Sequence, residues 1–503
     1  MNLKVIFYIQ GIILKFEAAF LMLPCIVAFI YRERQGLVYL ILAVLCLAAG
    51  NLLTRRRPEN MTIYATEGLL SVAFAWLLLS LTGAIPFVLT GDIPNYIDAV
   101  FETASGFTTT GASILTDVGA LTKSGLFWRS FTHWIGGMGV IVFILAIMPM
   151  MGGYNMHLMR AESPGPTVGK LVPKMRDSAK LLYIIYLALT LSETLILFIT
   201  GLPLFDALTI SFGSAGTGGF AVRSSGMGDY SLLSQAVIAV FIIMFGINFN
   251  FYYLIRGKNR RDAFKMTEVK GYLIMIAVSV TAITIDLLFY HVYSNPGRAL
   301  HEAFFQVGSI MTTTGFATAD FNVWPALSKS ILLILMFIGA CAGSTGGGFK
   351  VSRVLILAKS FKQEIIRLLH PRSVITVKMD GKALDKETVR QVAVYAAVYV
   401  GVFVASFLLL NVFEEHDMET TISAVTACYN NIGPGFSLVG PMANYSFFGV
   451  PAKLILIFDM LAGRLELYPI LILFVPEVWK KARKQAEEDM ARRKRYKGKG
   501  GLA

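Results

Sequence analysis

Long apolar runs alternate with short polar connections along the whole chain of 503 residues. Two apolar segments come first, near 5–31 and 36–53, and many later runs reach the ~20 residues that a membrane-spanning helix needs. Four times a short segment rich in threonine and glycine interrupts the apolar sequence. Glycine and β-branched threonine are poor helix formers, and non-helical backbone at membrane depth survives only where protein covers it or it lines water. The pattern therefore predicts an all-α polytopic membrane protein with four internal loops.

The four loops belong to a unit that recurs along the chain. Each unit has a long apolar helix, a short semi-polar helix, the loop, and a second long apolar helix; the second helices are expected near 126–150, 232–256, 327–369 and 450–480. Aligned on one glycine each, the loops lie 108, 96 and 118 residues apart. We expect two N-terminal transmembrane helices in 1–60, pore repeats in 61–155, 175–257, 266–370 and 386–480, and a basic tail in 481–503.

Four such loops around one axis would give rings of backbone carbonyl oxygens, which can replace the hydration shell of an ion. The alignment leaves Gly218 as an alternative to Gly219, and Gly435 as an alternative to Gly433. Tight glycine packing between helices is the competing interpretation of the loops. The candidate ion-binding residues are Thr109, Thr110, Gly111, Gly218, Gly219, Thr313, Thr314, Gly315, Asn431, Ile432, Gly433 and Gly435.

The composition supports a membrane protein: 15% of residues are charged, against roughly 25% in soluble domains. The net charge of +13 could suggest nucleic acid, but the basic residues cluster in alternate connections and in the tail. This positive-inside pattern predicts a cytoplasmic C-terminus and places the four loops near the outer side; Arg32 and Arg34 depart from it. We expect no nucleic-acid partner, no organic cofactor, and no cleavable signal peptide.

Charged and small residues within the apolar sequence are further candidates. The short helices carry an acid near each start, so their C-terminal ends would aim partial negative charge at the loops and favour cations; simple capping is the alternative. Glu17, Glu67, Glu193 and Asp286 could couple transport to protons or sodium, although such residues more often pair or cap. We expect His133, beside Trp134, at the membrane interface. The acids at the helix starts are Asp98, Asp206, Glu302 and Glu419.

The segment from Gly339 to Gly348 should break the second helix of the third repeat, because a run of small residues cannot hold a lipid-facing helix. Arg464 lies within the last apolar helix, where a charge is costly and by default functional. It could instead form a structural pair with Glu466 or Asp459. Lys350 and Arg353 could face the inner mouth or reach the membrane surface.

Together these residues resemble the membrane subunit of the Trk potassium-uptake system, of the TrkH type in the Trk/Ktr/HKT superfamily. Besides the four loops, the resemblance rests on residues 134–139 (Trp-Ile-Gly-Gly-Met-Gly), 343–350 and 462–466. It covers nearly the whole chain. It implies four non-identical repeats around a pseudo-fourfold pore in the bacterial cytoplasmic membrane, a homodimer, and a cytoplasmic nucleotide-binding regulatory ring of the TrkA type.

The resemblance also implies roles for single residues. Members with serine at the first aligned glycine tend toward sodium, whereas this chain has glycine in all four loops, which favours K⁺ as the transported ion. The break in the third repeat acts as a gate in the family, and the arginine corresponding to Arg464 faces the permeation path. The implied gate residues are Gly343, Ser344, Thr345, Gly346, Gly347, Gly348 and Arg464.

The expected function is thus potassium uptake through a gated, channel-like pore. A secondary transporter that couples K⁺ or Na⁺ to protons is the alternative, but it needs a titratable relay at mid-membrane and the sequence has no clear constellation of carboxylates. An enzyme would need a cluster of His, Asp or Cys at one membrane face, and the sequence predicts none.

Overall fold

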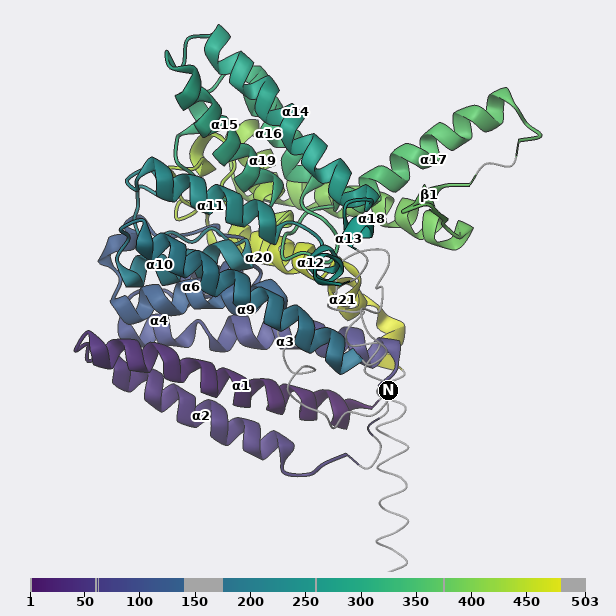
Figure 1. The fold of residues 1–503 in the computed structure, drawn as a ribbon. Coiled ribbons are helices and arrows are strands. Elements are labelled where there is room, and N and C mark those ends of the chain that lie inside the picture. Colours follow the sequence, from purple (N-terminus) through teal and green to yellow (C-terminus); the bar gives the residue numbers. More distant parts are fainter. Residues whose placement is uncertain are drawn as a thin grey trace, which may run out of the picture.

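The computed structural model describes residues 2–58, 61, 63–139, 175–257, 260–373 and 376–480. Within them the chain is almost entirely helical (Figure 1). The predicted basic tail, 481–503, and the predicted end of the first repeat, 140–155, lie outside the described residues. So do parts of the basic connection between the first two repeats.

The two N-terminal helices, α1 (Leu3–Ile30) and α2 (Gly36–Thr54), form a pair along one side of the molecule (Figure 1). They approach closely because a Cβ on Gly50 would lie 2.7 Å from the carbonyl oxygen of Gly11. Small residues allow such close backbone contact between membrane helices. Helix α1 is bonded to the first repeat, since Thr82 donates to the Glu17 carboxylate at 2.7 Å.

Four helix–loop–helix units follow, as the sequence predicts, each with a short helix between two longer elements. The first has α3 (Ala65–Thr82), α4 (Ile85–Thr90), α5 (Tyr96–Phe107) and α6 (Lys123–Met138), and the second has α9 (Met175–Ile199), α10 (Leu204–Gly216), α11 (Leu232–Phe245) and α12 (Phe249–Arg256). The third has α14 (Thr267–Phe289), α15 (Pro296–Met311), α16 (Ala326–Ile338) and α17 (Val351–Leu369), and the fourth has α18 (Lys386–Phe413), α19 (Met418–Tyr429), α20 (Val450–Arg464) and α21 (Tyr468–Leu471).

The second helices are shorter than the apolar runs predict. The expected break in the third repeat is present, between α16 and α17. The expectation of continuous helices over 232–256 and 450–480 is wrong: α11 and α12 meet at a 90° bend, and α20 ends at Arg464, before Leu467 at φ 69°. At the bend, hydrogen bonds to the third repeat compensate the freed backbone groups: the Phe249 N–H donates to the Gly343 carbonyl, and the Gly246 carbonyl accepts from the Cys341 N–H.

The smaller elements lie in the connections. A 3-10 turn follows the loops of the first, third and fourth repeats, at η1 (Val118–Ala120), η2 (Phe321–Val323) and η3 (Ser437–Val439). The remaining elements are α13 (Arg260–Ala263), η4 (Ile472–Phe474) and a two-stranded antiparallel hairpin of β1 (Lys378–Met379) and β2 (Lys382–Ala383), in which Lys378 faces Ala383. The hairpin lies beside α17, which projects from the helical body (Figure 1).

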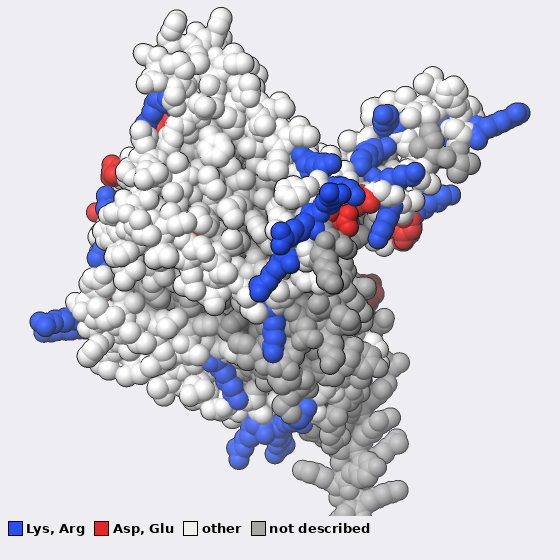
Figure 2. Space-filling model, viewed as in Figure 1, with Lys and Arg blue, Asp and Glu red and all other residues white. Residues whose placement is uncertain are grey.

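Charge is distributed as expected for a membrane protein. Six helices are long and apolar enough to span a membrane, or seven if the bent pair α11–α12 is one span. Figure 2 shows a broad middle region almost without charged side chains, and Lys and Arg gathered near the projecting α17 and α18. The chain is a multi-pass membrane protein with a basic end.

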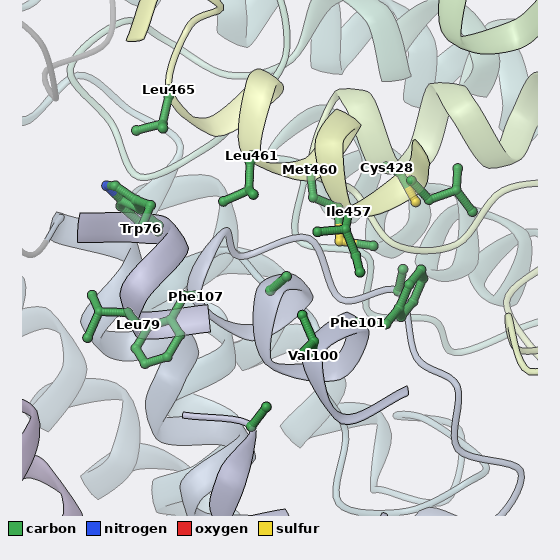
Figure 3. Packing of buried hydrophobic residues seen from close by; sticks show 14 of the residues in the cluster. Trp76, Leu79, Val100, Phe101, Phe107, Cys428, Ile457, Met460, Leu461 and Leu465 are labelled. Atoms are coloured by element: carbon green, nitrogen blue, oxygen red, sulfur yellow. The ribbon is translucent and has the colours of Figure 1, made fainter. Parts of the chain in front are cut away.

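Packing joins the last repeat to the first. Figure 3 shows Trp76 and Leu79 of α3 with Phe101 of α5 in one cluster that also holds Met460 and Leu461 of α20. All of these side chains are at most 3% exposed. Between membrane helices such contacts stabilise through close packing rather than through the hydrophobic effect. The first and last repeats, although far apart in sequence, are thus in direct contact.

Candidate functional site

The four Thr/Gly loops have the same backbone bonding. In each, the residue before the aligned glycine donates its N–H to the carbonyl five residues earlier, at 2.8 Å in all four repeats. This closes the C-terminal end of each short helix with a tight turn. The pairs are Thr110 with Ser105, Gly218 with Gly213, Thr314 with Ser309 and Ile432 with Ala427.

The loops also share a dihedral signature. The aligned glycine has a positive φ in every loop: 83° at Gly111, 77° at Gly219, 79° at Gly315 and 98° at Gly433. The residue two positions earlier is left-handed as well, with φ between 53° and 59° at Thr109, Thr217, Thr313 and Asn431. A non-glycine residue in this region is strained, so four equivalent outliers indicate a required geometry rather than chance.

The four glycines form a closed ring, and we call them the ring glycines. A Cβ on Gly111 would collide with the carbonyl oxygen of Gly218, one on Gly219 with that of Thr314, and one on Gly315 with that of Ile432. A Cβ on Gly433 would lie 2.7 Å from the carbonyl oxygen of Thr110, so the fourth loop abuts the first and closes the ring. Each loop thus abuts the next, and only a residue without a side chain fits between them.

This geometry separates the alternatives in the alignment. Gly219 and Gly433 occupy the ring, and Gly218 precedes its ring glycine as Thr110 does. Gly435 lies outside the ring, where its N–H donates to Val439 at 2.7 Å and a Cβ would meet Ser423 of α19. Thr217, which was not among the predicted ion-binding residues, is equivalent to Thr109 when the loops are aligned on Gly219.

A hollow open to solvent lies on one face of the ring, with about 770 Å³ of space not filled by protein atoms. All four ring glycines line it, and among the described residues around it there are two arginines, Arg129 and Arg223, but no carboxylate. The acids at the starts of the short helices are instead ion-paired, at 2.5–3.2 Å. The pairs are Asp98–Lys453, Asp206–Arg223, Glu302–Arg298 and Glu419–Lys329.

Polar side chains support the loops from behind. The hydroxyls of Thr108 and Thr110 are 2.8 Å apart, and Asn431 donates to Thr110 at 2.9 Å, which links the fourth loop to the first. His133 fills the corresponding space behind Gly218, where any Cβ would collide with its ring. The expectation that His133 is interfacial is wrong, since it is 0% exposed. The feature of the sequence that could have indicated the position of His133 is Gly218, because glycine has no side chain and leaves room for the imidazole ring.

Arg129 and Glu102 brace the first and second loops. Their buried side chains form an ion pair at 2.6 Å, and Glu102 also accepts from the Ile114 N–H at 3.0 Å. Arg129 donates to the Ala221 carbonyl at 2.8 Å and its guanidinium lies 3.5 Å from the centre of the Phe220 ring. A planar guanidinium suits this combination of a carboxylate, a carbonyl and an aromatic face.

The segment between α16 and α17, residues 339–350, lies directly beneath the ring, and we call it the intramembrane loop. The Gly347 N–H donates to the Thr313 hydroxyl at 2.6 Å. A Cβ on Gly347 would collide with the Asn430 carbonyl, and one on Gly346 would lie 2.7 Å from the Thr312 carbonyl. The intramembrane loop therefore fills the space under the third and fourth Thr/Gly loops.

Cationic side chains hold this loop in place. Arg464 donates to the Thr345 carbonyl at 2.8 Å, and it also bonds the carbonyls of Gly136 and Gly137 at the end of α6. A cation is favourable at a helix C-terminus. Lys350, only 2% exposed, donates to the Gly346 carbonyl. Arg464 of the fourth repeat therefore connects the intramembrane loop to the end of α6 in the first repeat.

The other charged candidates have local partners. Arg353 is 4% exposed and forms an ion pair with Glu466, so neither it nor Lys350 reaches the membrane surface. Asp286 accepts from the Ser328 hydroxyl at 2.6 Å. Glu193 is the exception among these candidates, since both of its carboxylate oxygens are buried without a hydrogen-bond partner in the described part of the chain. A cavity below the intramembrane loop is lined by Arg464, Lys350 and Trp76 among others, with about 720 Å³ of unfilled space.

Comparison with known proteins agrees with this architecture. The family described as "TrkH: Cation transport protein" matches residues 35–481. A Trk system potassium uptake protein TrkH from Salmonella typhimurium is 36% identical, over 95% of this chain and 100% of its own length. A Trk system potassium uptake protein TrkG from Escherichia coli is 32% identical, over 95% and 99%. The crystal structure of the potassium transporter TrkH from Vibrio parahaemolyticus superposes on this chain with a TM-score of 0.85 at 34% identity. The superposition covers 95% of this chain and 100% of the Vibrio chain. The chain belongs to the TrkH family of cation transport proteins.

Proposed function

We propose that this chain is the pore-forming membrane subunit of a potassium-uptake system, and that K⁺ crosses the ring as a dehydrated ion held by backbone carbonyls. The observation that carries this proposal is the closed ring itself. Four loops of equivalent dihedral angles meet around one axis, and each ring glycine abuts the carbonyl that precedes the next one. Carbonyl rings of this kind select potassium in other channels. The names of the most similar relatives point to the same ion.

The carbonyls that would hold the ion come from the residues already named. They are Thr109, Thr110, Gly111, Thr217, Gly218, Gly219, Thr313, Thr314, Gly315, Asn431, Ile432 and Gly433. The ion moves down its electrochemical gradient, and the membrane potential contributes about 2.3 kcal/mol per charge per 100 mV. The C-terminal ends of the four short helices meet the loops and add partial negative charge there. The hollow outside the ring admits the hydrated ion.

Residues 343–348 form the gate in this proposal, with Arg464 as the residue that holds it closed. The support is position: the intramembrane loop fills the space below the ring and is bonded to Thr313, Arg464 and Lys350. A cytoplasmic, nucleotide-binding regulatory subunit of the TrkA type controls the gate, and the chain acts as a homodimer in the bacterial cytoplasmic membrane with its C-terminus in the cytoplasm. The positive-inside pattern supports this orientation, because Lys and Arg gather at one end of the molecule (Figure 2).

The test is the ratio of K⁺ to Na⁺ flux in proteoliposomes for wild type and Gly315→Ser. A side chain there collides with the Ile432 carbonyl, so we expect the variant to lose its preference for K⁺ while the protein still folds. Gly91→Ser is the matched control, because Gly91 has the same positive φ, 80°, but no atom within 4 Å of its Cβ position. An unchanged ion preference in Gly315→Ser would remove the filter assignment.

Proton coupling is tested by the same vesicles. The buried acids Glu17 and Asp286 bond hydroxyl groups that join neighbouring helices, which accounts for them without a relay. We expect the reversal potential to follow the K⁺ gradient and to be indifferent to a pH gradient. A reversal potential that moves with pH would replace the pore by a coupled transporter.

A further inference from the structure

Glu268 is a buried carboxylate that the proposed gate does not yet explain. It is the second residue of α14 and is 6% exposed. Its Oε1 accepts from the Ala342 N–H at 2.6 Å and from the Ser352 N–H at 3.1 Å. Its Oε2 accepts from the Asn248 side-chain amide at 3.3 Å. One carboxylate therefore contacts three separate segments of the chain.

These three segments are the two ends of the intramembrane loop and the bend in the second repeat. Ala342 lies near the start of the loop, and Ser352 lies in the first turn of α17, where an acid is favourable. Asn248 lies between α11 and α12, and its side chain also caps α12 by accepting from the Asn250 N–H at 2.9 Å. Glu268 thus fixes the width of the intramembrane loop and attaches it to the neighbouring repeat.

Backbone bonds strengthen the same junction. The Phe249 N–H donates to the Gly343 carbonyl at 3.0 Å, and the Cys341 N–H donates to the Gly246 carbonyl at 3.1 Å. The first of these bonds lies at the start of α12 and the second at the end of α11. The intramembrane loop and the 90° bend are therefore one bonded assembly. Because buried backbone groups must keep their partners, the loop and the bend are expected to move together.

We propose that Glu268 is a positioning residue that holds the intramembrane loop closed and couples it to α12, so that displacement of α12 opens the pore. The carboxylate acts on the backbone of the loop and does not touch the ion. This inference rests on the proposed gate, but it makes a claim of its own: the second repeat, through its bend, controls a loop of the third. Arg464 and Lys350 donate to carbonyls of the loop, whereas Glu268 accepts from backbone N–H groups at its two ends.

The first test is K⁺ flux into proteoliposomes, without any regulatory subunit, for Glu268→Gln. The amide keeps the size of the side chain but replaces an acceptor oxygen by a donor, so at least one of the bonds to Ala342, Ser352 and Asn248 is lost. We expect flux to rise about tenfold, the effect of losing a hydrogen bond to a charged group. The K⁺/Na⁺ flux ratio stays as in wild type, because the ring is untouched.

Glu387→Gln is the matched control. Glu387 is also the second residue of the first helix of its repeat, α18, but it is exposed and bonds Arg390 and Gln391 of its own helix. Its substitution leaves flux unchanged. Wild-type flux in Glu268→Gln, or an equal rise in both variants, would overturn the proposal.

Asn248→Ala supplies a second measurement that does not depend on the folding of Glu268→Gln. It removes the bond from the bend while the carboxylate keeps its two backbone donors, and we expect a smaller rise in flux. In the double variant the two effects should be less than additive, as for residues that act through one contact. Full additivity would contradict the coupling. A changed K⁺/Na⁺ flux ratio in either variant would contradict the proposal, because it would place Glu268 in the filter and not in the gate. Failure of the proposed filter itself would appear only as an unchanged ion preference in Gly315→Ser.

Discussion

The four Thr/Gly loops hold their shape through backbone bonds that recur in every repeat. The intramembrane loop occurs only in the third repeat, among the described residues, and is held by single side chains of the third and fourth repeats and by backbone bonds to the second. The ring depends on what the repeats share: the 2.8 Å turn bond, the left-handed residue and the ring glycine. The loop beneath depends on single residues such as Glu268, Lys350 and Arg464. In the proposed function, ion selection is therefore shared by four equivalent loops, whereas gating has one location. Substitutions in the ring should change ion preference, and substitutions around the intramembrane loop should change only the amount of flux.

The strongest way to break this comparison is to place serine at Gly111, Gly219 and Gly433 in turn. Each position has a positive φ and a carbonyl or peptide group of the next loop in the way. We expect each variant to lower the K⁺/Na⁺ flux ratio by roughly a hundredfold, since backbone strain of about 1–2 kcal/mol adds to the collision.

The control for Gly433→Ser is Gly201→Ser, because Gly201 has the same φ of 98° and open space at its Cβ position. If one ring glycine alone controlled ion preference, the equivalence of the four loops would not hold.

An intermediate effect is expected at Arg464. Replacement by alanine removes the bonds to Thr345, Gly136 and Gly137. Partner-free K⁺ flux should rise roughly tenfold at an unchanged K⁺/Na⁺ ratio, measured by tracer uptake into proteoliposomes. Arg464→Lys keeps the charge but loses the planar, forked guanidinium, so its flux should lie between those of the wild type and Arg464→Ala. Arg390→Ala, at an exposed ion pair of α18, serves as control, and no increase in the Arg464 variants would separate this residue from the gate.

The smallest effect sharpens the comparison within the ring itself. The Tyr445 hydroxyl donates to the Gly433 carbonyl at 2.8 Å, which orients that carbonyl from the fourth repeat. Tyr445→Phe should lower the K⁺/Na⁺ ratio roughly threefold, the size of one neutral hydrogen bond, as read from competitive uptake. Tyr230→Phe is the control, since its hydroxyl bonds Asp206 at 3.0 Å and no ring carbonyl. A ratio equal in both variants would mean that the fourth loop keeps its geometry without this bond.

The sequence predicts well those features that small residues or apolar length impose directly. The two N-terminal helices, the recurring short helices and the break at Gly339 follow from apolar runs and from glycine, and all are present. Arg464 stands out because charge is rare at membrane depth. These signals are local, so they can be read from one segment at a time.

Features that depend on contacts between repeats could not be predicted. The bend at Asn248 and the end of α20 lie in apolar sequence that would suit a continuous helix. In the structure, Asn248 bonds Glu268 of the third repeat, and Arg464, at the end of α20, bonds carbonyls of the first and third repeats. The sequence places His133 at the membrane interface because it is polar and lies beside Trp134, whereas in the structure its ring fills the space left by Gly218. The choice between Gly433 and Gly435 likewise depends on which of them faces the first loop. Long-range packing decides each of these cases.

The junction between the first and last loops has a consequence for biosynthesis. Thr110 receives the Asn431 side chain from 321 residues further along the chain, an interval that takes on the order of tens of seconds to translate. Until the fourth repeat has entered the bilayer, the first loop has no neighbour on that side and its peptide groups face an open gap. A chain that stalls before the fourth repeat would therefore lack the residue that closes the ring at Thr110.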